Sequence, residues 1–218
     1  MRPAELDLKK IIIMTKIYLI SPEKIDLDNF PTRLKSALGT GLVEVFQLRL
    51  KGYSDFDVKE ISQKLKEICH ANNCLFILND YSNIALEIGA NGVHVGSDDR
   101  SILELKKIAT ENFIIGASCY DSRHLAMKAA EEGADYISFG AFFKSKTKES
   151  RGQPGIEIVE WSLELMNLPI IAIGGIDDEN CKELVKTGVD FISVISYVWD
   201  HPQGEVIALE NLSKSISN

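Results

Sequence analysis

Short apolar runs rich in β-branched residues recur along the chain about every 20 to 30 residues, with longer amphipathic stretches between them. Eight such runs occupy residues 17–20, 43–48, 75–78, 92–95, 113–117, 136–139, 170–173 and 191–195. Between the runs, apolar residues return at three- and four-residue steps, as at Val58, Ile61 and Leu65, which is the spacing of an amphipathic helix. The pattern predicts repeated β-α units around a parallel sheet.

Eight units without a linker or a break in composition favour a single (β/α)8 TIM barrel over a doubly wound sheet. A doubly wound sheet predicts a glycine-rich turn after its first strand, and the sequence Ile20-Ser21-Pro22-Glu23 has none. We therefore expect one α/β barrel domain over residues 14–218. Residues 1–13 are expected to be an N-terminal extension, with Met14 as an alternative start.

Net charge, apolar runs and cysteine content limit which kinds of molecule this protein is expected to bind and where it is expected to be found. The 218 residues carry a formal net charge of −8, which gives no electrostatic footprint for nucleic acid. The apolar run at residues 11–14 is too short for a membrane span or a signal peptide. The four cysteines form no C-x-x-C pair, so we expect reduced thiols and a cytoplasmic protein. An anionic substrate then needs locally clustered cations or a metal ion.

Polar side chains gather where the predicted strands end. The alternation of a strand places Gln47, Arg49 and Lys51 on one side, which carries two cations and an amide. The third strand ends at Asp80, and Asp98 and Asp99 follow the fourth. Because these ends are neighbours in a barrel, Asp80 and one of the other two aspartates can converge on a hard cation, and open water positions suit Mg²⁺.

A second anion site is predicted after the last two strands. Gly174-Gly175 and Ile195-Ser196 match the usual barrel phosphate pocket, in which backbone N–H groups hold an oxyanion. The first anion site, formed by Arg49, Lys51 and the bound Mg²⁺, also receives Lys148 from the loop after the sixth predicted strand. It suits a diphosphate leaving group, whereas the second site suits a single phosphate.

The residues at these strand ends resemble the thiamine phosphate synthase family over most of the chain from about residue 17 onward. Seven short motifs occur in order: Q-L-R-x-K at 47–51, N-D at 79–80, G-V-H-x-G-x-x-D at 92–99, G-x-S at 116–118, D-Y-x-x-F-G at 135–140, S-K-T-K at 145–148 and A-I-G-G-I at 172–176. Each is short, but their order at the predicted strand ends is specific. Enzymes of this family join a hydroxymethylpyrimidine diphosphate to a thiazole phosphate with Mg²⁺ and release diphosphate.

The resemblance implies roles for individual residues. It implies Gln47, Arg49, Lys51, Asn79, Ser118 and Lys148 as ligands of the pyrimidine diphosphate, with Arg49, Lys51, Lys148 and Ser118 as catalytic groups; Asp80 and Asp99 as Mg²⁺ ligands; and Ser145, Lys146, Thr147, Gly175, Ile195 and Ser196 as contacts of the thiazole phosphate. It also implies a dissociative reaction, in which the pyrimidine ring expels diphosphate and the thiazole nitrogen captures the cation without a general base.

The chain departs from the family pattern at Leu50, Ser97-Asp98, Lys144-Ser145 and Tyr197, and none of these positions removes a metal ligand or a diphosphate cation. Plainer interpretations remain open: Asp80 as a turn residue, Asp98 or Asp99 as a helix cap, and His94 as a packed histidine. Rival functions are a thiazole tautomerase-like relative, a phosphosugar isomerase, and a ligand-binding regulator without activity. The partners expected are small molecules, and a homo-oligomer is compatible with every interpretation.

Overall fold

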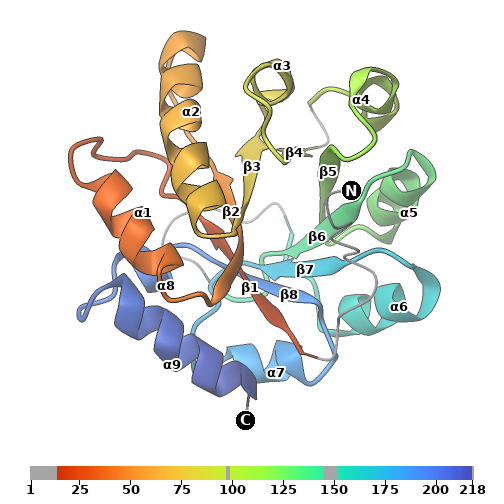
Figure 1. Ribbon diagram of the computed structural model, residues 1–218. Coiled ribbons are helices and arrows are strands. Elements are labelled where there is room, and N and C mark those ends of the chain that lie inside the picture. Colours follow the sequence, from red (N-terminus) through yellow and green to blue (C-terminus); the bar gives the residue numbers. More distant parts are fainter. Residues whose placement is uncertain (1–13, 97–98, 145–151, 218) are drawn as a thin grey trace, which may run out of the picture.

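The computed structural model describes residues 14–96, 99–144 and 152–217. Eight parallel strands close into a barrel in the order β1 to β8, which confirms the predicted (β/α)8 fold (Figure 1). The strands are β1 (Lys16–Ile20), β2 (Val43–Leu48), β3 (Leu75–Asn79), β4 (Gly92–Val95), β5 (Ile114–Tyr120), β6 (Tyr136–Gly140), β7 (Ile170–Ile173) and β8 (Phe191–Val194). The predicted extension at residues 1–13 lies outside the described part of the chain.

Helices surround the barrel (Figure 1). They are α1 (Phe30–Leu38), α2 (Asp55–Ala71), α3 (Ser82–Glu87), α4 (Ile102–Ile108), α5 (Arg123–Glu131), α6 (Glu157–Leu165), α7 (Cys181–Val185), α8 (Ser196–Trp199) and α9 (Glu205–Ser217). The C-terminal helix α9 packs against α1, α7 and α8, which covers the seam between the first and last strands. Among the described residues, no helix combines the length and apolar character needed to cross a bilayer.

Strand alternation divides the core into two layers. Along β2 and the residues that follow it, Phe46, Leu48 and Leu50 pack in the layer between the sheet and the helices. Val45 belongs instead to a smaller cluster inside the barrel, with Tyr18, Ile77, Tyr136, Ile171 and Phe191 among its members. Because side chains alternate along the regular part of a strand, the residues between the outward ones face the barrel interior. This constraint brings polar side chains into the barrel mouth.

Several predicted strand boundaries were wrong by one to three residues, and two of these differences, together with one helix cap, affect site residues. Strand β5 continues to Tyr120, so Ser118 lies within the strand, beside an irregularity in its pairing with β6. Strand β8 ends at Val194, and Ile195 is already the N-cap of α8. Ser101, not Asp99, is the N-cap of α4, because the Asp99 carboxylate accepts a hydrogen bond from the backbone N–H of Gly96.

Gly116 in β5 provides a test of packing inside the barrel. A Cβ atom at this position would lie 1.9 Å from the Tyr136 ring, so we expect Gly116→Ala to destabilise the protein by about 1–3 kcal/mol through overpacking. Urea denaturation measures the change in the free energy of unfolding. Gly41→Ala is the comparison without overpacking, because its new methyl group meets no atom within 4 Å. Its φ of 69° strains any side chain, so a loss of stability in this variant reports backbone strain alone. Equal stability of Gly116→Ala and wild type would contradict this account.

Candidate functional site

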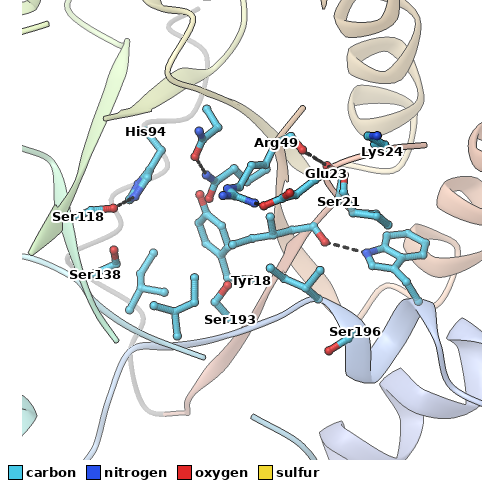
Figure 2. Close-up of a pocket in the computed structure, with 18 of the residues that line it drawn as sticks. Tyr18, Ser21, Glu23, Lys24, Arg49, His94, Ser118, Ser138, Ser193 and Ser196 are labelled. Atoms are coloured by element: carbon cyan, nitrogen blue, oxygen red, sulfur yellow. Dashed lines mark hydrogen bonds and ion pairs between the residues drawn. The ribbon is translucent and has the colours of Figure 1, made fainter. Parts of the chain in front are cut away.

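A cavity of about 420 Å³ opens at the carboxyl ends of the strands. Four of the residues expected at the diphosphate site, Gln47, Arg49, Asn79 and Ser118, line it. Figure 2 shows Arg49 and Ser118 at different sides of the cavity, together with His94, Tyr18 and several serines. The expectation that chemistry gathers where the strands end therefore agrees with where the structure places these side chains.

The backbone around Arg49 is fixed by the segment that follows β1. The Arg49 N–H donates to Ser21 Oγ at 2.9 Å, and Ser21 N–H donates to the Gln47 carbonyl at 2.9 Å. Two residues further on, Lys51 N–H donates to the Glu23 carbonyl at 3.1 Å. These bonds extend the pairing of β1 and β2 beyond the strands, so Arg49 leaves a supported backbone.

Glu23 is a residue that the sequence interpretation missed. Its carboxylate lies 2.5 Å from Arg49 Nη1, and Figure 2 shows this contact at the cavity wall. Arg49 is largely buried, whereas Glu23 is about half exposed, with a side-chain exposure of 48%. A carboxylate thus lies against the guanidinium that is expected to bind an anionic substrate. No short motif singles out Glu23, because its contact with Arg49 depends on how two loops meet.

The amides of Gln47 and Asn79 contact each other inside the mouth. Gln47 Nε2 donates to Asn79 Oδ1 at 2.5 Å, and both residues are buried. Each amide has both a donor group and an acceptor group, so this contact leaves the Gln47 oxygen and the Asn79 nitrogen for a ligand. Two neighbouring strands thereby present a fixed pair of polar groups.

Two carboxylates and a lysine meet at the rim of the barrel mouth, past the ends of β2, β3 and β4. They do not line the 420 Å³ cavity; Asp99 lines a smaller cavity that shares Ser118 with it. Lys51 Nζ lies 2.9 Å from Asp80 Oδ2, and the Asp80 and Asp99 carboxylates are in hydrogen-bonding contact. Asp80 has a φ of 67°, a left-handed conformation that aspartate tolerates better than most residues. Its N–H donates to the His94 carbonyl at 2.9 Å, which anchors this turn to β4. The structure thus brings together the two expected metal ligands.

Partial burial raises the pKa of Asp99, and the neighbouring Asp80 carboxylate raises it further. The Gly96 N–H and the Lys51 ammonium group act in the opposite direction but do not cancel these effects. Two carboxylates this close form an oxygen donor set that a hard divalent cation would stabilise. No group of three or more metal-ligating side chains occurs among the described residues. The pair therefore fits Mg²⁺ whose remaining ligands are water and substrate oxygens.

His94 lies beneath this rim, and burial lowers its pKa to about 4. The negative charge of Asp80 raises the pKa and the positive charge of Arg49 lowers it, but both effects are smaller than that of burial. The imidazole is therefore neutral at neutral pH. Its Nε2 lies 2.9 Å from Ser118 Oγ, a contact drawn in Figure 2. The plain interpretation of His94 as a packed, hydrogen-bonded histidine agrees with this environment.

A second cavity of about 330 Å³ lies over the ends of β7 and β8. Gly175, Ile195 and Ser196 line it, as does Tyr197, one of the departures from the family pattern. A Cβ atom on Gly175 would lie 2.6 Å from the Lys144 carbonyl oxygen, so only glycine fits this close approach of two loops. The predicted contacts Ser145, Lys146, Thr147 and Lys148 lie outside the described residues.

The two cavities adjoin. Both are lined by Ile173, Ser193, Ile195, Ser196 and Asp200. Two small molecules held in these cavities would therefore meet above β7 and β8. The arrangement suits a reaction between two bound partners, because holding both in place converts an encounter in solution into a step within one complex.

Comparisons with known proteins agree with this geometry. The sequence model of a protein family, described as thiamine monophosphate synthase, matches residues 17–198. The thiamine-phosphate synthase of Rhodospirillum centenum is 41% identical over 199 residues, covering 91% of this chain and 96% of that protein. The thiamine-phosphate synthase of Erythrobacter litoralis is 42% identical over 191 residues, covering 86% and 89%. The solved thiamine phosphate pyrophosphorylase from Pyrococcus furiosus has a TM-score of 0.80 and 33% identity, covering 93% of this chain and 95% of that one.

The raised pKa of Asp99 has a consequence for stability without metal. A raised pKa in the folded state gives stability below the ordinary carboxyl pKa, and this stability is lost as pH rises through the raised value. We therefore expect metal-free Asp99→Asn to melt at a higher temperature than wild type at neutral pH, with the difference disappearing in acid. Thermal denaturation from acidic to neutral pH measures it.

Glu111→Gln is the control for the loss of one negative charge, because Glu111 is an exposed residue of the α4–β5 loop. Mg²⁺ should raise the melting temperature of wild type but not that of Asp99→Asn. A lower melting temperature for metal-free Asp99→Asn at neutral pH would show that the two carboxylates do not oppose each other.

Proposed function

The chain belongs to the thiamine monophosphate synthase family, and we propose that it joins hydroxymethylpyrimidine diphosphate to thiazole phosphate, forming thiamine phosphate and releasing diphosphate. Members of this family are transferases. The observation that carries the proposal is the group formed by Lys51, Asp80 and Asp99 at the same barrel end as Arg49, with Ser118 lining both the 420 Å³ cavity and the smaller cavity at Asp99. Cations beside a carboxylate pair suit a diphosphate that arrives with a divalent ion.

The pyrimidine diphosphate is assigned to the 420 Å³ cavity. Gln47 and Asn79 would orient it through the amide groups that their mutual contact leaves available. Arg49 and Lys51 would bind its phosphate oxygens, and Lys148 is proposed to join them. Ser118 would donate a hydrogen bond from the opposite wall. These charges and donors stabilise negative charge that increases as the diphosphate leaves, which is where electrostatic catalysis acts.

Asp80 and Asp99 are proposed to hold Mg²⁺. The ion, when bound, would neutralise charge on the departing diphosphate. Lys51 contributes whether or not the ion is present, because its ammonium group already lies 2.9 Å from Asp80 Oδ2 and partly offsets the negative charge there.

The thiazole phosphate is assigned to the 330 Å³ cavity. Its phosphate would meet the backbone at Gly175, Ile195 and Ser196, with Ser145, Lys146 and Thr147 completing the contacts. Because the two cavities share residues of β7 and β8, the thiazole ring would face the pyrimidine carbon from which diphosphate departs. Neither partner needs a general base: one loses a stable anion and the other already has a nucleophilic nitrogen.

The purified protein with both substrates and Mg²⁺ is expected to form thiamine phosphate and diphosphate in equal amounts. Asp80→Asn tolerates the φ of 67° but removes the charge, so we expect kcat/KM for the pyrimidine diphosphate to fall by about 10²-fold or more. Glu111→Gln is the control and should leave turnover unchanged. Chromatography of thiamine phosphate measures product. Absence of product from wild type at saturating substrates would favour the non-catalytic regulator instead.

The contact between Glu23 and Arg49 predicts competition with substrate anions. An exposed ion pair contributes at most about 1 kcal/mol, so we expect Glu23→Gln to bind inorganic pyrophosphate with Mg²⁺ up to about fivefold more tightly than wild type. Titration calorimetry measures the affinity. Glu44→Gln is a matched control, since it breaks the pair between Glu44 and Lys16 near the start of the β1 and β2 strands. Weaker binding by Glu23→Gln would show that Glu23 supports Arg49 and does not compete with the ligand.

A further inference from the structure

A chain of four hydrogen-bonding side chains runs from the centre of the barrel to the 420 Å³ cavity. The hydroxyl groups of Tyr18 and Tyr136 lie 2.9 Å apart, and Tyr136 Oη lies 2.9 Å from His94 Nδ1. His94 Nε2 lies 2.9 Å from Ser118 Oγ. All four side chains line this cavity, but they differ in exposure. Tyr18, Tyr136 and His94 are buried, at 2%, 4% and 7% exposure, whereas Ser118 is half-buried. The Tyr18 end of the chain is therefore almost closed, and the Ser118 end is the one that a ligand can reach.

The central tyrosine is held in one position by its neighbours. The Tyr136 ring lies where Gly116 has no side chain, at 1.9 Å from the position a Cβ atom would take. The same ring stacks on the His94 ring, with ring centres 5.5 Å apart and an angle of 20° between the planes. The geometry of the contact between Tyr136 and His94 is thus set by packing, and the hydroxyl group of Tyr136 has little freedom to seek another partner.

The proton positions follow from counting donors and acceptors. A neutral imidazole carries one N–H and one acceptor nitrogen, so the chain has two consistent directions. In one, Tyr18 donates to Tyr136, Tyr136 to His94 Nδ1, and His94 Nε2–H to Ser118. In the other, Ser118 donates to His94 Nε2, His94 Nδ1–H donates to Tyr136, and Tyr136 donates to Tyr18. The Tyr18 O–H then has no acceptor within the chain.

Burial separates the two directions. Within the described residues, Tyr136 is the hydrogen-bonding partner shown for the Tyr18 hydroxyl, and Tyr18 is only 2% exposed. With the His94 proton on Nδ1, Tyr136 accepts from it, and either the Tyr136 or the Tyr18 O–H is then left buried without an acceptor, which native proteins rarely allow. The first direction places all three buried protons in hydrogen bonds. Its remaining proton is that of Ser118, which lies at the cavity.

We propose that Tyr136 is a positioning residue that keeps His94 protonated on Nε2, so that Ser118 accepts from His94 and directs its own O–H into the cavity. The role assigned to that O–H rests on the proposed function: it would donate to an oxygen of the departing diphosphate. A donor whose direction is fixed before the reaction needs no reorientation as charge develops, and this is the condition under which such groups lower a barrier most.

Nitrogen-15 NMR of histidine-labelled protein tests the proton positions without any assay of turnover. In wild type, we expect His94 Nε2 to be protonated and Nδ1 to show the signal of an unprotonated, hydrogen-bonded nitrogen. In Tyr136→Phe, which keeps the ring over Gly116, the Nδ1 signal should move downfield because it loses its donor. His70 is an internal reference, since its Nε2 lies 2.9 Å from Asn91 Oδ1, far from this change. Protonated Nδ1 in wild type, or an unchanged Nδ1 signal in Tyr136→Phe, would overturn the proposal.

Tyr18→Phe is the matched control, because it also removes a buried tyrosine hydroxyl from the same chain. Tyr136 keeps His94 as its acceptor in this variant, so the His94 proton should remain on Nε2. A shift of the His94 proton to Nδ1 in Tyr18→Phe would contradict the direction assigned to the chain.

Kinetics test whether the effect acts through Ser118. The loss of one oriented hydrogen bond predicts that Tyr136→Phe lowers kcat by about tenfold. The KM for the thiazole phosphate should stay unchanged, because the chain faces the other cavity. In a Ser118→Ala background, Tyr136→Phe should cause no further fall, since the two changes interrupt one path. An equal further fall would show that Tyr136 acts independently of Ser118. A wrong assignment of the reaction would abolish wild-type turnover but leave the NMR result intact.

Discussion

Alternation of side chains along eight parallel strands is the constraint on which this protein depends. Outward residues such as Phe46 and Leu48 are buried beneath the helices. Because side chains alternate along a strand, the residues between them face the barrel interior. The lower part of that interior is closed by an apolar cluster that includes Val45 and Ile77. Near the carboxyl ends the same positions carry an amide, a guanidinium and an imidazole. Packing on one face of the sheet therefore places the chemistry on the other.

The sequence was sufficient for those parts of the structure that depend on periodicity. Eight apolar runs predicted the barrel. The two-residue spacing of Gln47 and Arg49 predicted that both side chains would face its mouth. The proximity of Asp80 and Asp99 followed from the order of strands, because consecutive strands are neighbours in a barrel. Errors occurred where local hydrogen bonds override periodicity, as where Gly96 engages the carboxylate that was a candidate helix cap.

Contacts between segments far apart in sequence could not be predicted in this way. Glu23 reaches Arg49 because the loop after β1 continues alongside the residues after β2. The Tyr18–Tyr136 contact joins residues 118 positions apart across the barrel interior. Tyrosine in a strand is usually a packing residue, so nothing in either local sequence distinguishes these two. Their arrangement depends on the closed barrel and on the missing side chain at Gly116, which only the three-dimensional structure reveals.

The charges at the site explain how a protein with a net charge of −8 can accept a highly charged anion. Arg49 and Lys51 are each paired with a carboxylate, from Glu23 and Asp80 respectively. Under the proposed function, binding a diphosphate would therefore be an exchange of anionic partners, and a divalent cation would offset the charge that the carboxylates retain. Unpaired cations would bind phosphates of many kinds. Cations already paired bind well only an anion that brings enough charge, or a metal ion of its own, to displace the resident carboxylates. A site of the proposed kind would favour a metal-bound diphosphate over simpler phosphates, because the same ion pairs of Arg49 and Lys51 would have to be displaced.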